Sequence, residues 1–225
     1  MFDRLLLLCE KYPLDFITYF CSSLPIFSGF IRYKYLSSLA KLIIIFFLFF
    51  AIKETISISY SLFDKNNLYL ENIESISYIL ILLAISWLST DNVAWKRITV
   101  ILATVCLTAS LFTYQSDSIS PIGPSAFRLF AIFICLSYFN KILTDISIKN
   151  ILLHTMFWFI SGLLFYTAGT FFIMLFNGYW YKDIKLVPAE TFDKYWNSSQ
   201  LLFIAFCVLS AYGLWLSKYD KENLT

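Results

Sequence analysis

Ionisable side chains gather near the same end of three apolar segments of this chain. Lys53 and Glu54 lie near the end of the second apolar segment, Glu71 and Glu74 begin the third, and Arg128 begins the fifth. Because a charge inside a membrane is costly, such residues tend to face the bundle interior or a water-filled cavity. A rise of about 1.5 Å per residue places Glu54, Glu74 and Arg128 at a shared depth. The pattern therefore predicts a polar pocket at one end of a helical bundle.

In this pocket we expect Arg128 to be the counter-ion of Glu54 and Glu74, or to contact an anion. Tyr78 lies one turn below Glu74 and is expected to line the same cavity. The alternative is that these side chains reach the lipid headgroups or form a structural bridge between helices.

The sequence contains no pattern typical of catalysis, of a cofactor or of a metal ion. It has a single histidine, His154, which excludes HExxH, and it has no G-x-S-x-G elbow. Its five cysteines are scattered singly, and a cysteine in an apolar helix usually behaves as a small hydrophobic residue. The last apolar segment lacks the lysine that a retinal protein needs. We therefore expect a protein that is not an enzyme and binds no metal, with His154 at the membrane interface.

The elements that hold these residues are apolar helices. The 225-residue chain is 59% hydrophobic, against roughly half in an ordinary soluble domain. A helix that crosses a bilayer needs about 20 mostly apolar residues. We predict an all-α membrane protein, a seven-transmembrane helix bundle over residues 14–217, between a short amphipathic segment (1–13) and a tail (218–225). The predicted spans are Leu14–Ile31, Leu39–Ser59, Leu70–Thr90, Ile98–Tyr114, Ala126–Leu143, Ile151–Phe176 and Ser199–Ser217.

The first span is the least regular, because Pro25 and several hydroxyl residues lie inside it. If this segment is only interfacial, the bundle has six spans. Lysine and arginine beside the spans give the orientation, since they favour the cytoplasmic side. Those that share one side are Arg32, Lys34, Lys41, Lys96, Arg97, Lys141, Lys149, Lys218 and Lys221. The N-terminus is therefore predicted outside and the C-terminus in the cytoplasm.

Helix packing and interface anchoring explain two further patterns. Gly162 and Gly169 lie two turns apart with Tyr166 near the same face, and small residues let helices approach closely in lipid. The predicted loop 177–198, the longest outside the spans, carries aromatic residues at both ends. They are Tyr179, Trp180, Tyr195 and Trp196, which we expect to anchor the loop at the membrane interface.

Several motifs resemble a group of small multi-span proteins common in Bacteroidota. They are Phe-Trp-Phe-Ile-Ser-Gly from Phe157, Ala-Ile-Lys-Glu-Thr-Ile around Glu54, the isoleucine–glutamate at Glu74, and Ile-Arg-Tyr-Lys-Tyr-Leu from Ile31. The likeness runs from about Pro25 to Lys218. Such regions stand alone or precede histidine-kinase modules, so the resemblance implies a membrane sensor or an accessory subunit.

Together these observations predict an integral protein of the bacterial inner membrane that signals through a protein partner or a homo-oligomer and binds no nucleic acid. One alternative is a pore-forming or depolarising effector of an antiviral or CRISPR-linked defence system. A transporter of ions or small molecules is another.

Overall fold

A computed structural model describes residues 2–63, 65–144, 150–176 and 189–223. In this part of the chain the regular structure is helical, and seven helices are long and apolar enough to cross a membrane. They are α2 (Pro13–Ile31), α3 (Ser38–Leu62), α4 (Tyr69–Ser89), α5 (Val93–Phe112), α6 (Ile122–Thr144), α7 (Thr155–Leu175) and α9 (Ala189–Trp215). The short helices are α1 (Phe2–Lys11), η1 (Tyr33–Tyr35), η2 (Ile151–Leu153) and α10 (Ser217–Asn223). The predicted fold class and the count of seven spans are confirmed.

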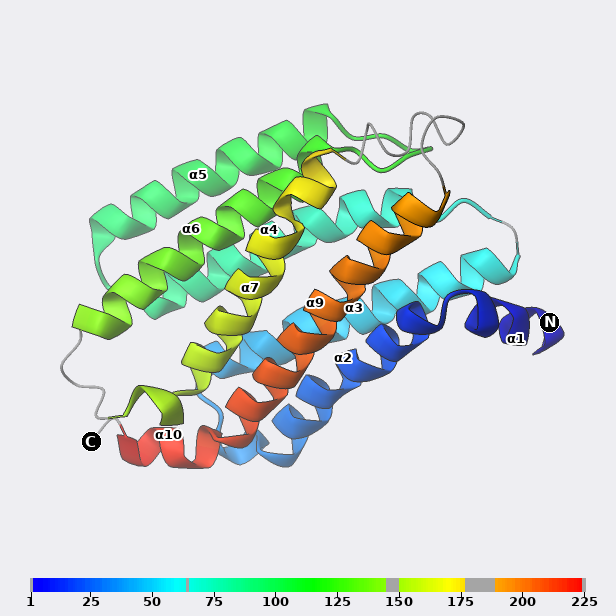
Figure 1. The fold of residues 1–225 in the computed structure, drawn as a ribbon. Coiled ribbons are helices and arrows are strands. Elements are labelled where there is room, and N and C mark those ends of the chain that lie inside the picture. The colour runs from blue at the N-terminus through cyan, green and yellow to red at the C-terminus, as the bar shows by residue number, and fades with distance from the viewer. Residues whose placement is uncertain (1, 64, 145–149, 177–188, 224–225) are drawn as a thin grey trace.

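Six of the long helices form a closed ring in the order α2, α3, α4, α6, α7 and α9, and α9 packs back against α2. The seventh, α5, packs on the outside against α4 and α6 (Figure 1). The α1 helix lies at one end of the bundle and α10 at the other, so these are called the α1 end and the α10 end (Figure 1).

Local sequence explains where the helices begin. Pro13 opens α2, at the position where a missing N–H costs nothing. The Ser37 hydroxyl accepts from the Ala40 N–H at the start of α3, and the Asn92 side chain accepts from two N–H groups at the start of α5. The α2 helix continues through Pro25, which is buried in the bundle, so the first segment is a full-length helix.

Several predicted boundaries differ from those of the helices, and the fourth span, predicted from Ile98, begins at Val93. The last long helix begins at Ala189 rather than Ser199, because a helix can continue past its apolar stretch into polar residues at the membrane surface. At the α10 end, part of the predicted tail (218–225) forms α10, which packs near η1 and η2. The predicted sixth span is also divided, since η2 precedes α7.

The centre of the bundle is filled by aromatic rings. Phe46 of α3 stacks on Tyr78 of α4 with ring centroids 3.9 Å apart, and its edges meet Phe159 of α7 and Phe206 of α9. All four side chains are almost completely buried. The aromatic core therefore joins four helices of the ring at mid-depth.

Glycines allow α7 and α9 to approach closely. A Cβ at Gly162 would lie 2.9 Å from the Phe206 ring, and one at Gly169 would lie 2.7 Å from Leu202. Both predicted packing glycines thus face α9, and the third predicted packing residue, Tyr166, stacks on Phe206 of the same helix. The tightest backbone contact, at Gly213, was not predicted. A Cβ there would lie 2.7 Å from the Thr155 carbonyl oxygen.

We expect Gly213→Ala to lower the free energy of unfolding in detergent by about 1–3 kcal/mol, because a backbone carbonyl cannot rotate away from the new methyl group. Gly123→Ala is the matched control, since its nearest atom would be Ser110 Oγ at an ordinary 3.7 Å. Thermal unfolding followed by circular dichroism measures both variants. Equal melting temperatures would contradict the close approach at Gly213.

Candidate polar site at the α1 end

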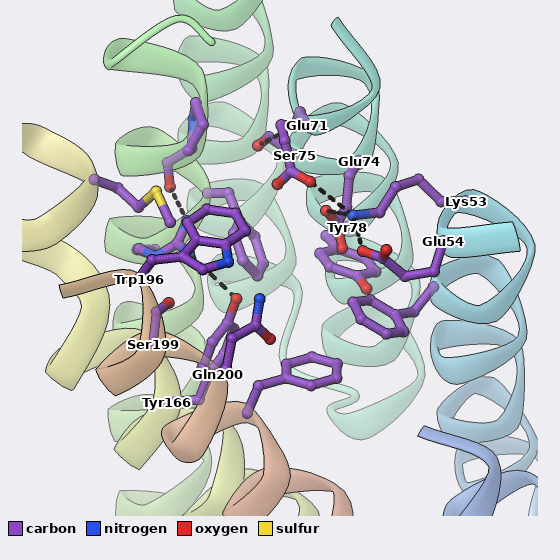
Figure 2. A pocket seen from close by; sticks show the side chains of 16 residues that line it. Lys53, Glu54, Glu71, Glu74, Ser75, Tyr78, Tyr166, Trp196, Ser199 and Gln200 are labelled. Atoms are coloured by element: carbon purple, nitrogen blue, oxygen red, sulfur yellow. Dashed lines mark hydrogen bonds and ion pairs between the residues drawn. The ribbon is translucent and has the colours of Figure 1, made fainter. Parts of the chain in front are cut away.

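Lys53 is the centre of a buried ion cluster between α3 and α4. Its Nζ lies 2.6 Å from Glu54 Oε1, 2.8 Å from Glu71 Oε1 and 2.9 Å from Glu74 Oε2 (Figure 2). Only 4% of the Lys53 side chain is exposed. The ammonium group donates hydrogen bonds to Glu54 and Glu71 and forms an ion pair with Glu74. Such full pairing is what makes a charge tolerable away from water.

Arg128 makes different contacts from those predicted. Its Nε donates to Thr170 Oγ1 at 2.7 Å, its Nη2 to the Tyr166 hydroxyl at 3.2 Å, and its Nη1 to the Pro124 carbonyl at 3.0 Å. The side chain is buried, with 4% of the residue exposed. Arg128 therefore joins α6 to α7 through neutral partners.

The predicted pairing of Arg128 with Glu54 and Glu74 is wrong. In the described part of the chain, the ion pairs of both glutamates are with Lys53. The reason is geometric: Lys53 extends from α3 toward the face of α4 that carries Glu71 and Glu74. Their spacing of three residues places both carboxyl groups on one helix face. The sequence contains the signal for this pairing, because Glu71 and Glu74 share a helix face at the depth of Lys53, but the prediction did not pair them.

A small cavity of about 50 Å³ separates the ion cluster from Arg128. It brings together all four predicted pocket residues, Glu54, Glu74, Tyr78 and Arg128, with side chains from α9 on its other side (Figure 2). This volume is enough for water. The Tyr78 hydroxyl is buried here and interacts with the Glu74 carboxyl group. The cavity therefore places the buried Tyr78 hydroxyl beside charged groups of both signs.

A larger cavity of about 430 Å³ lies beside the first, between α2, α3 and α9, and shares Glu54, Glu71 and Trp196 with it. Trp196 Nε1 donates to Asp15 Oδ1 at 2.9 Å, which ties α9 to α2. The residue predicted as an interface anchor is thus also a wall of both cavities. Asp15 was not predicted as a site residue.

The remaining predicted anchors differ in how far the structure describes them. Tyr195 is 39% exposed near the start of α9. Tyr179 and Trp180 lie outside the described residues.

Asn72 holds the chain that covers this end of the bundle. Its Nδ2 donates to the carbonyls of Gln115 and Ser118, and its Oδ1 accepts from the Ser120 N–H at 2.8 Å. The residue is 3% exposed. One buried side chain therefore fixes the α5–α6 connection above α4, close in sequence to Glu71 and Glu74.

A second polar junction lies at the α10 end. His154 Nδ1 lies 2.8 Å from Asp220 Oδ1, its Nε2 lies 3.1 Å from the Tyr138 hydroxyl, and the Thr155 N–H donates to Asp220 Oδ2. Burial raises the pKa of Asp220, but the hydrogen bonds and the charge interaction with His154 outweigh burial and hold this pKa below its ordinary value of 3.8. His154, expected to be a simple interface residue, instead binds α10 to the start of α7.

Comparison with known proteins adds no relative: no family model matches the chain, and neither a curated protein nor a solved structure is significantly similar to it. The resemblance described from sequence motifs therefore stays a prediction.

The reassigned ion cluster predicts which pairs are energetically coupled. Lys53→Met leaves three carboxyl groups without their counter-charge and should lower the free energy of unfolding by about 3–5 kcal/mol. Adding Glu74→Gln should recover part of this loss. A double-mutant cycle should give a coupling energy of about 0.5–3 kcal/mol for Lys53 with Glu74. The matched cycle of Arg128→Ala with Glu54→Gln should be nearly additive. A larger coupling energy for Arg128 with Glu54 than for Lys53 with Glu74 would contradict the assignment.

The Asp220 contacts predict a pH-dependent attachment of α10. Because the folded-state pKa is lowered, the contribution to stability is complete above pH 3.8 and is lost as the pH falls through the lower folded value. Asp220→Asn should speed amide exchange of residues 217–223 at neutral pH, with a loss of about 1–3 kcal/mol in opening free energy. Lys218→Gln, at an exposed neighbour, is the control. Unchanged exchange in Asp220→Asn would show that the carboxylate does not hold α10.

Proposed function

We propose that this integral membrane protein is a non-catalytic sensor or accessory subunit that binds a ligand at the α1 end and signals through a protein partner at the α10 end. The observation that carries the proposal is the buried Lys53 cluster with two adjoining cavities. Charged groups at membrane depth are expensive and mark functional sites more often than packing sites. In the proposed orientation the α1 end faces outward and the α10 end faces the cytoplasm of a bacterial cell.

The α7 helix supplies a physical link between the two ends. Near the α1 end its Tyr166 and Thr170 accept hydrogen bonds from Arg128, and at the α10 end its first turn contacts Asp220. A ligand that binds one position of α7 more tightly than another shifts the helix between them. Such a shift would alter the attachment of α10, which is the surface we assign to the partner or to a second copy of this chain.

Transport through a single bundle receives less support. Below the small cavity, Phe46, Tyr78, Phe159 and Phe206 fill the core and contact one another. A polar pathway would require these buried rings to separate. The alternative of a depolarising effector predicts a collapse of membrane potential on induced expression, which a potential-sensitive dye would reveal.

Co-purification with matched variants tests the sensor proposal. The tagged full-length chain is extracted from native membranes in a mild detergent, and the retained partner is quantified. We expect Glu74→Gln, which neutralises one carboxyl group of the cluster, to change the retained amount by about fivefold, the lower range of ordinary allosteric coupling. Phe172→Leu, at an exposed position of α7, should have no effect. A chain that retains no partner, or equal retention by both variants, would refute the proposal.

A further inference from the structure

The larger cavity combines the volume of a small-molecule site with a mostly acidic lining. Its volume of about 430 Å³ falls within the range of roughly 300–1,000 Å³ that is usual for small-molecule sites. The ionisable side chains that line it are Asp15, Glu54, Glu71, Asp193 and Lys11. The acids outnumber the bases four to two even when the Lys53 ammonium, which pairs with Glu54 and Glu71, is counted, so the charge around the cavity is net negative at neutral pH.

Aromatic side chains supply the apolar part of the same lining. The rings of Tyr12, Phe16, Phe50 and Trp196 all border the cavity. The face of an aromatic ring attracts a cation and also packs well against an apolar body. Carboxyl groups and rings around one space therefore favour an amine that carries an apolar group over a simple hydrated metal ion.

The Thr18 hydroxyl is a second, independent indication that the larger cavity holds a ligand. Thr18 borders the larger cavity, is 2% exposed, and its Oγ1 has no hydrogen-bond partner among the described residues. A buried polar group left unpaired is costly, and such groups need an explanation such as a ligand or water. The Asp15 carboxyl also keeps acceptor capacity, because Trp196 uses one of its lone pairs.

Lys53 shows within the same chain what these carboxyl groups bind. Its primary ammonium lies within 2.9 Å of three glutamates, and two of them, Glu54 and Glu71, also border the larger cavity. The carboxyl surface thus contacts one ammonium from its inner side. A second ammonium, from a ligand, would approach from the side of Asp15 and Thr18.

We propose that the cavity between α2, α3 and α9 binds an organic amine, with its ammonium group at Asp15 and Glu54 and its apolar body against Phe50 and Trp196. This inference names the ligand class of the proposed sensor site and rests on that function only for its biological meaning. Two sources share this chemistry, a free amine and the ammonium headgroup of phosphatidylethanolamine.

Ligand-dependent thermal stability of the full-length chain in phosphatidylglycerol nanodiscs provides the test. The probe is 2-phenylethylamine, compared with neutral 2-phenylethanol and anionic phenylacetate. We expect a saturable rise in melting temperature with the amine, as mass action requires for a ligand of the folded state. The alcohol and the acid should produce none. Adding phosphatidylethanolamine should weaken the response to the probe if the lipid headgroup competes, and should leave it unchanged if the site takes free amines alone.

Two variants locate the site. Asp15→Asn keeps an acceptor for Trp196 but loses the charge, and should weaken amine binding by about tenfold, as for a charge-assisted hydrogen bond. Thr18→Val should weaken binding by about threefold without lowering the melting temperature of the free protein. Thr167→Val is the matched control, because Thr167 is buried in α7 and already bonded to the Leu163 carbonyl.

An equal response to all three probes, no response to the amine, or full binding by Asp15→Asn would overturn the inference. These outcomes are distinct from failure of the sensor proposal, because amine binding is measured without a partner. A chain that binds the amine but retains no partner would refute the sensor function and leave the binding site intact.

Discussion

Burial of the Lys53 ammonium among three carboxyl groups is the constraint on which the α1 end of this bundle depends. Removing an ion from water is costly, and mutual attraction offsets that cost only when every charged group is well paired. Lys53 comes from α3, while two of its three partners come from α4, so the relative depth and rotation of these helices are fixed by ion pairing.

The rest of the bundle is arranged to support that polar end. Aromatic rings fill the middle, and close α7–α9 packing at the glycines joins the ring. Because lipid gives helices no hydrophobic reason to associate, such close contacts and interhelical hydrogen bonds are what hold a membrane bundle together. Arg128 and Asp220, near opposite ends of α7, use charged side chains for the same purpose.

Much of the fold could be predicted from the sequence, because the bilayer requires long apolar helices and the described part of the chain forms seven. The depth of Glu54, Glu74 and Arg128 followed from counting residues along each helix. Their partners did not follow, because pairing depends on how neighbouring helices rotate. For this reason Lys53 was not predicted as the centre of the ion cluster, and Arg128 was predicted with the wrong partners. Asp15 and Asp220 could not be found, since each acts across more than sixty residues of intervening sequence.

Amine-reactive labelling tests the central claim most directly, because it distinguishes a buried Lys53 from one that reaches the headgroups. Intact membranes are treated with a membrane-impermeant succinimidyl ester, and modification of each lysine is measured by mass spectrometry. Lys65 is exposed in the neighbouring α3–α4 connection and serves as the internal reference. If Lys53 is held by Glu54, Glu71 and Glu74, it stays unmodified while Lys65 is labelled. Labelling of Lys53 at a rate similar to that of Lys65 would contradict the ion cluster and the site built around it.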